Sequence, residues 1–276
     1  MLNTKASFLI FLKQRLKSTA FAAVIFTYLA FCITTLTVQI FNFSEKGIGM
    51  CCAYMTFVPL ILIAEYLLNI RCGALFTAAL LFIPAGSIMG NLFNVYTTVP
   101  FFDTVLHGTS GVIFAGLGFT VAEKFFGNGR KDLKGFFGCL VFAISFSLAI
   151  AVLWEIFEYT ATAIFGLDLM ADSYISGIAS YLLSGTHSEA VELNGITQTI
   201  IYYGEGSTYV INGYLDIGLI DTLTDMIICT VGAVFFCILS FVGYIKFPKI
   251  NDTLIPKCCV TKEGCECGEN SANADI

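Results

Sequence analysis

Charged residues are scarce in this 276-residue chain: 12% of the residues are charged, whereas 57% are hydrophobic. Soluble globular proteins carry about twice that share of charge, so this composition, with a mean hydropathy of +0.83, excludes an ordinary soluble protein. The net charge of -6 leaves no basic surface and excludes nucleic acid as a partner. The sequence also lacks a Walker or Rossmann glycine loop and a motif for a nucleophilic serine or cysteine, so it supports neither nucleotide binding nor covalent catalysis.

The sequence contains several long apolar segments. A helix that crosses a bilayer needs about 20 predominantly apolar residues. Six segments meet this requirement, namely Phe21–Ile40, Ile48–Leu68, Gly73–Leu92, Phe102–Ala122, Gly135–Tyr159 and Ile220–Ile245. We therefore predict an all-α polytopic membrane protein, a six-helix transmembrane bundle with the lipid bilayer as its surroundings.

Lysine and arginine predict the orientation of this bundle. They lie before the first apolar segment, between the second and third, between the fourth and fifth, and after the sixth, and only Lys46 falls on the other side. Because basic residues favour the cytoplasmic side, we expect a multi-pass protein of the plasma membrane with both termini cytoplasmic. The predicted parts are a cytoplasmic interfacial segment (1–20), the membrane domain (21–245) and a cytoplasmic cysteine-containing tail (246–276). The 160–219 connection contains neither lysine nor arginine and should be extracytoplasmic.

This extracytoplasmic insertion should contain some β structure. Short strands are predicted at Val191–Leu193, Ile196–Tyr203 and Ser207–Ile211, because each is rich in β-forming residues and is bounded by glycine. They would form a small hairpin or a three-stranded cap. The preceding stretch, Asp168–Leu183, is predicted as an interfacial helix.

Other features have local interpretations. Glu65, near the end of the second apolar segment, should pair with Arg71. The tail has four closely spaced cysteines, but the spacing matches no standard zinc pattern, and we expect a reduced, disordered tail. Cysteines of the membrane helices, Cys229 among them, are expected to pack as small apolar groups.

Three pairs of ionisable residues lie inside apolar segments, and each pair is spaced by three or four residues. The pairs are Asp103 with His107, Glu155 with Glu158, and Asp221 with Asp225. Residues at this spacing share a helix face, and the predicted topology puts all three pairs at the extracytoplasmic end. They should converge in a shallow layer of Asp103, Glu158 and Asp221 and a deep layer of His107, Glu155 and Asp225.

Five carboxylates around one histidine cannot all stay charged and unpaired in a low-dielectric setting, so a metal ion, shared protons or a cationic substrate must neutralise them. We expect His107, Glu155 and Asp225 to hold a divalent metal such as Zn, Mn or Mg, the metals that oxygen and imidazole ligands favour. Glu158 or Asp103 would then transfer protons. Asp221, Trp154 and Asn91 complete the predicted polar site.

Three functions remain open at this point. The first is a metal-dependent membrane hydrolase or envelope-modifying enzyme that acts on a lipid-linked or envelope substrate. The second is a proton- or cation-coupled transporter that uses the same carboxylates. The third is a non-catalytic scaffold that presents the 160–219 insertion to another envelope protein. Independently of function, Asp103 and Asp221 are predicted to cap the starts of their helices.

The pattern resembles the bacterial YjdF-type inner-membrane proteins. The resemblance is carried by Phe102-Asp103-x3-His107 with Gly111, by Trp154-Glu155-x2-Glu158, and by Asp221-Thr222-x2-Asp225 with Gly232. The arrangement is more distantly similar to VanZ-like proteins, a resemblance that implies an envelope setting. Neither family resemblance implies a particular substrate.

Overall fold

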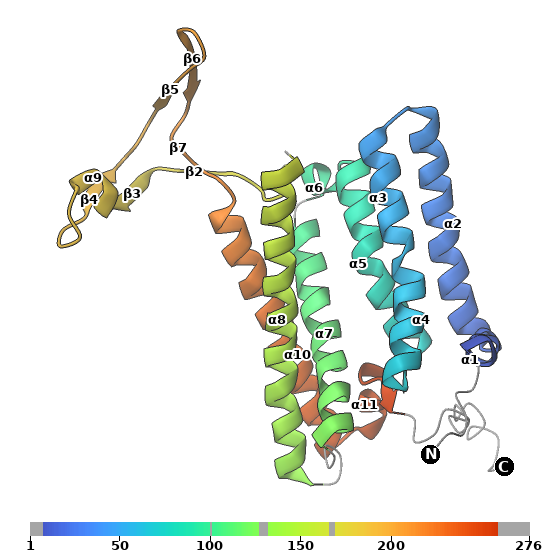
Figure 1. The fold of residues 1–276 in the computed structure, drawn as a ribbon. Helices are drawn as coiled ribbons and strands as arrows, with labels where there is room; N and C mark the ends of the chain where they lie inside the picture. The colour runs from blue at the N-terminus through green and yellow to red at the C-terminus, as the bar shows by residue number, and fades with distance from the viewer. Residues whose placement is uncertain (1–7, 100, 127–131, 166–168, 259–276) are drawn as a thin grey trace, which may run out of the picture. The chain divides into compact units, whose positions relative to one another are not determined.

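Helices dominate the computed structural model, which describes residues 8–99, 101–126, 132–165 and 169–258. The helices are α1 (Phe8–Leu16), α2 (Thr19–Phe41), α3 (Glu45–Met55), α4 (Phe57–Leu68), α5 (Ala74–Leu92), α6 (Val95–Thr98), α7 (Phe102–Phe126), α8 (Leu133–Phe165), α9 (Tyr181–Ser184), α10 (Leu219–Ile245) and α11 (Pro248–Leu254) (Figure 1). The strands are β1 (Ile70–Arg71), β2 (Ser173–Ile175), β3 (Gly177–Ser180), β4 (Val191–Asn194), β5 (Thr199–Tyr203), β6 (Ser207–Ile211), β7 (Tyr214–Asp216) and β8 (Lys257–Cys258).

Six of these helical segments are long and apolar enough to cross a membrane: α2, α3 together with α4, α5, α7, α8 and α10. The predicted all-α polytopic fold with six membrane-spanning helices is therefore confirmed. Large apolar side chains such as Phe26, Leu60 and Ile238 point outward from these helices and are exposed. Such an arrangement is costly in water and favourable in hydrocarbon, so a multi-pass position in a bilayer follows.

The chain divides into two compact units. The first combines Met1–Ile150 with Ile228–Ile276, and the second is Ala151–Ile227. In the first unit α5 packs against both α2 and α7. One buried cluster in this unit is built on aromatic rings from three helices: the Phe119 ring centroid lies 5.2 Å from that of Phe136 and 6.5 Å from that of Phe236.

A buried ion pair connects α1 to α4. Arg15 donates from Nε to Glu65 Oε2 at 2.8 Å and from Nη2 to Glu65 Oε1 at 2.9 Å. Arg15 Nη2 also donates to the Cys72 carbonyl oxygen, and the Cys72 amide donates to Glu65 Oε1, each at 2.8 Å. The predicted partner of Glu65 was wrong: the guanidinium of Arg71 lies over the Phe11 ring, 4.3 Å from its centroid. The short helix α1 supplies a nearer cation, because its Arg15 side chain reaches into the end of α4.

The residues after α10 fold back onto the first unit. We call residues 247–258, which contain α11 and β8, the C-terminal strap. β8 pairs antiparallel with β1, and Thr120 of α7 donates to the Pro256 carbonyl oxygen at 3.1 Å. Ile255 and Pro256 are almost fully buried, which explains why this polar stretch is ordered. The expectation of a disordered tail is therefore wrong up to residue 258, and the remaining tail cysteines lie outside the described residues.

The second unit contains three antiparallel strand pairs: β2 with β7, β3 with β4, and β5 with β6. All three predicted strand segments contain strand, and the β5–β6 hairpin turns through Gly204 and Gly206, both with positive φ. The interfacial helix predicted for Asp168–Leu183 is wrong within the described residues, since this stretch forms β2, β3 and only the four-residue α9. The local sequence permits either a helix or strands here. Residues of β2 and β3 adopt the extended conformation because they pair with β7 and β4, which lie later in the chain.

Candidate functional site

Small residues bring α7, α8 and α10 into close contact within the first unit. A Cβ atom placed on Gly111 would collide with the carbonyl oxygen of Cys229, and one placed on Gly232 would collide with the carbonyl oxygen of Gly108. On the other side of α7, Ser147 of α8 donates to the Gly111 carbonyl oxygen at 3.1 Å. Backbone approach of this kind is how glycine stabilises helix packing in membranes.

Asp103 and His107 form a pair at the start of α7. His107 Nε2 lies 3.6 Å from Asp103 Oδ1, as expected for residues four apart on one helix face. The histidine side chain is 13% exposed, whereas the aspartate side chain is 42% exposed. The carboxylate therefore remains partly open while it fixes one side of a mostly buried imidazole.

The other side of the His107 ring faces Cys229 of α10. Cys229 Sγ lies 3.8 Å from His107 Nδ1, 3.2 Å from Ser110 Oγ, and 3.3 Å from the His107 carbonyl oxygen. Ser110 Oγ in turn donates to this carbonyl oxygen at 2.7 Å. The prediction that Cys229 packs as an apolar group was wrong, because its buried thiol is surrounded by polar atoms. The four-residue spacing between Asp225 and Cys229 was the sequence signal that could have revealed it.

Glu155 and Asp225 each extend a buried stripe of their own helix. On α8 the buried positions Ala143, Ser147 and Ala151 recur every four residues, and Glu155, 6% exposed, is the next in this series. On α10 Asp225, 5% exposed, lies one turn before Cys229 on the same face. Glu158 of α8 is half-buried. Both deep carboxylates thus lie on interior helix faces, where a charge needs compensation.

Asp221 connects α10 to the insertion within the second unit. Its Oδ2 accepts from the Ala171 amide at 2.7 Å. The predicted capping role belongs to another residue, because Asp216 Oδ2 accepts from the Ile220 amide at 2.9 Å, at the start of α10. Asp221 lies inside the first turn, as does Asp103 in α7, where a carboxylate interacts favourably with the helix dipole.

Two other predicted site residues have local contacts. The Trp154 ring lies 5.4 Å from the Phe157 ring, centroid to centroid, on the same helix. Asn91 Nδ2 donates to the Ser87 carbonyl oxygen at 3.1 Å, one turn earlier in α5. These contacts account for the positions of both side chains without a ligand.

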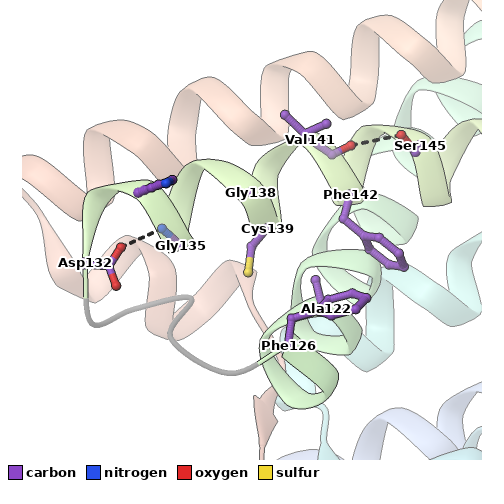
Figure 2. A pocket seen from close by; sticks show the side chains of 10 residues that line it. Ala122, Phe126, Asp132, Gly135, Gly138, Cys139, Val141, Phe142 and Ser145 are labelled. Atoms are coloured by element: carbon purple, nitrogen blue, oxygen red, sulfur yellow. Dashed lines mark hydrogen bonds between the residues drawn. The ribbon is translucent and has the colours of Figure 1, made fainter.

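An open depression lies at the far end of α7 and the start of α8 (Figure 2). It is lined by Ala122, Phe142 and Cys139 among others, and Asp132 accepts from the Gly135 amide at 2.7 Å at its edge. Ala122 is fifteen residues from His107, which places the depression about 22 Å along α7 from the Asp103–His107 pair. It is therefore separate from that pair.

Comparison with known proteins gives a family but no activity. A family model described as "Predicted membrane protein (DUF2238)" matches residues 21–245. No curated protein and no solved structure matches the chain.

Proposed function

The chain belongs to the DUF2238 family of predicted membrane proteins, and the description of this family names no reaction. From the residues of the site, we propose that the protein is a metal-dependent membrane hydrolase or envelope-modifying enzyme. The observation that carries the proposal is the mostly buried imidazole of His107, which has a carboxylate on one side and a thiol on the other. Histidines held in this way are typical of metal sites, because a second polar partner fixes the tautomer and the orientation of the ring.

The proposed ion is held by His107, Asp225 and Glu155. Asp103, His107 and Asp225 each offer a ligand atom, either an imidazole nitrogen or a carboxylate oxygen. Asp225 is supported by its position one turn from Cys229, whose thiol lies beside the imidazole of His107. Glu155 is supported by its place on the buried α8 stripe that includes Ser147, the residue that donates to α7. Two carboxylates would balance the charge of a divalent cation and remove the cost of burying them.

A divalent cation at this position would supply a bound water of lowered pKa, which is a strong nucleophile at neutral pH. Two further carboxylates could handle protons. Asp103 is the more open of the His107 neighbours, and Glu158 lies one turn beyond Glu155. Either side chain could accept a proton from water and return it to a leaving group.

The basic residues between the helices support a site that opens to the extracytoplasmic side of a plasma membrane, with both termini in the cytoplasm. A substrate would then reach the site from the outer surface or laterally from the lipid. This favours a lipid-linked or envelope substrate with a hydrolysable bond near the head group.

Metal analysis of the purified protein tests the proposal. We expect one divalent metal ion per chain after purification without chelators, and its loss in His107→Ala and Asp225→Asn. Glu123→Gln is the matched control, because Glu123 is an acidic residue near the opposite end of α7 and should leave the metal content unchanged.

The same analysis separates the alternatives. Wild-type protein that stays metal-free after incubation with zinc, manganese and magnesium would overturn the proposal. Proton uptake coupled to solute movement in proteoliposomes, abolished by Asp225→Asn without any bound metal, would establish the transporter in its place. Retention of function in His107→Ala, with loss on removal of the insertion, would establish the scaffold.

A further inference from the structure

Cys229 differs from the buried Cys237 of the same helix in what surrounds its sulfur, because an imidazole lies beside it. Its Sγ is within 3.8 Å of an imidazole nitrogen, a hydroxyl oxygen and a carbonyl oxygen. Cys237, two turns later on the same helix, has an Sγ contact of 3.6 Å to the Leu140 carbonyl oxygen and otherwise belongs to an apolar cluster. A thiol placed between polar groups, with an imidazole beside it, has the surroundings of a ligand.

We propose that Cys229 is a thiolate ligand of the metal ion at His107 and that the ion is therefore zinc. This inference rests on the proposed metal centre and names its metal and a further ligand, Cys229, which takes the place of Glu155, so that His107, Asp225 and Cys229 leave the fourth tetrahedral position to water. Binding of Zn²⁺ forms the Zn–S bond and displaces the thiol proton to solvent, so the step needs no oxidant or reductant.

The distance between the two donor atoms fits one shared ion. Zinc binds cysteine sulfur at about 2.3 Å and histidine nitrogen at about 2.0 Å, so two such ligands in a tetrahedral site lie roughly 3.6 Å apart. The observed separation of Cys229 Sγ and His107 Nδ1 is 3.8 Å. An ion could therefore bind both atoms with little movement of α7 or α10.

The backbone keeps this pair of donors in place. The contacts of Gly111 with Cys229 and of Gly232 with Gly108 hold α7 against α10 at a backbone-to-backbone distance. The Cys229 carbonyl region is thereby fixed against α7 one turn from His107. Ligands carried on rigid, closely packed helices lose little entropy on binding, which favours tight coordination.

The assignment also gives Asp103 a definite role. With Nδ1 of His107 directed to the ion, Nε2 carries the proton and faces Asp103 Oδ1 at 3.6 Å. This is the carboxylate–histidine–metal arrangement in which the carboxylate orients the ring and raises its basicity. Asp103 is then a positioning residue, and proton transfer at the proposed centre falls to Glu158.

A thiolate ligand narrows the choice among zinc, manganese and magnesium, which carboxylate ligands alone do not distinguish. Magnesium and manganese prefer oxygen ligands, whereas a set of thiolate, imidazole and carboxylate suits zinc. One thiolate and one carboxylate would also neutralise the charge of Zn²⁺ within the bundle.

X-ray absorption at the zinc edge of full-length, zinc-loaded wild-type protein tests this assignment. We expect a sulfur scatterer at about 2.3 Å in addition to nitrogen and oxygen neighbours near 2.0 Å. After substitution by Co²⁺, the protein should show a sulfur-to-cobalt charge-transfer band that is absent in Cys229→Ser and present in the matched control Cys237→Ser.

Each outcome decides the assignment. Bound zinc with nitrogen and oxygen neighbours alone would overturn the role of Cys229 and leave the proposed metal centre intact. Absence of any bound metal would overturn both. If Cys229→Ser does not fold, the wild-type absorption spectrum still decides whether sulfur is a ligand.

Discussion

The buried pair of Arg15 and Glu65 should make a large contribution to stability, and the change that tests it is Glu65→Ala. The two side chains are 7% and 2% exposed, so solvent screening is weak. The Glu65 carboxylate accepts two hydrogen bonds from Arg15 and one from the Cys72 amide, and the Arg15 guanidinium lies 3.6 Å from the Phe21 ring centroid. Removal of the carboxylate would leave a buried cation and a backbone donor without this partner.

Breaking one side of such a buried pair costs about 3–5 kcal/mol. At roughly 2–4 °C per kcal/mol for a domain of this size, the midpoint of thermal unfolding should fall by about 10 °C. The loss of helical circular dichroism on heating the detergent-solubilised protein measures it. Lys13→Ala is the matched control, because Lys13 is an exposed basic residue of the same helix.

The double variant Arg15→Met with Glu65→Leu sharpens the test. Replacing both charges removes the uncompensated cation, so this variant should unfold closer to wild type than Glu65→Ala does. A shift for Glu65→Ala no larger than about 0.5 kcal/mol, the range of an exposed surface change, would refute the reasoning.

Three further predictions concern the first unit. Gly111→Ala should destabilise the protein by about 1–3 kcal/mol, because the added Cβ would meet a carbonyl oxygen of α10. In the same melting assay Gly49→Ala should be neutral or slightly stabilising, because the space around its Cβ position is open. Thr120→Val should cost about 1–3 kcal/mol, because a buried carbonyl of the C-terminal strap loses its donor; an equal effect of the exposed Thr37→Val would contradict this. Burial raises the pKa of the Cys72 thiol, and the Glu65 carboxylate raises it further, so this thiol stays neutral at mildly alkaline pH and becomes a thiolate only as the pH approaches the raised pKa. An alkylating reagent should therefore modify Cys72 after unfolding and not before, as measured by mass spectrometry.

The sequence was sufficient for the membrane helices because their signal is local. A run of about 20 apolar residues can satisfy its backbone in a bilayer only as a helix, and each of the six runs did so. The same holds for β5 and β6, since β-forming residues on both sides of a glycine turn specify a hairpin by themselves.

Contacts between residues far apart in the sequence could not be predicted from local patterns. The partner predicted for Glu65 was six residues away, whereas its actual partner is fifty residues away on α1. Strands β2 and β3 are defined by partners later in the chain, and their own residues also permit a helix. The order of the C-terminal strap depends on burial of Ile255 in the first unit, which its polar composition conceals.

The candidate site was partly predictable for the same reason. Asp103 and His107 meet because a four-residue spacing on one helix brings side chains together. The contact of His107 with Cys229 joins two helices, and the four-residue spacing between Asp225 and Cys229 was the only local signal that Cys229 has polar neighbours. Glycines in α7 allow a close neighbour but do not identify which residue of that neighbour faces the imidazole.

Anomalous scattering from crystals of zinc-loaded protein would locate the metal ion that we propose beside His107. We expect an anomalous peak within coordination distance of His107 Nδ1 and Asp225. A structure of zinc-saturated protein with no peak at His107, or with Asp225 turned towards lipid, would contradict the proposal.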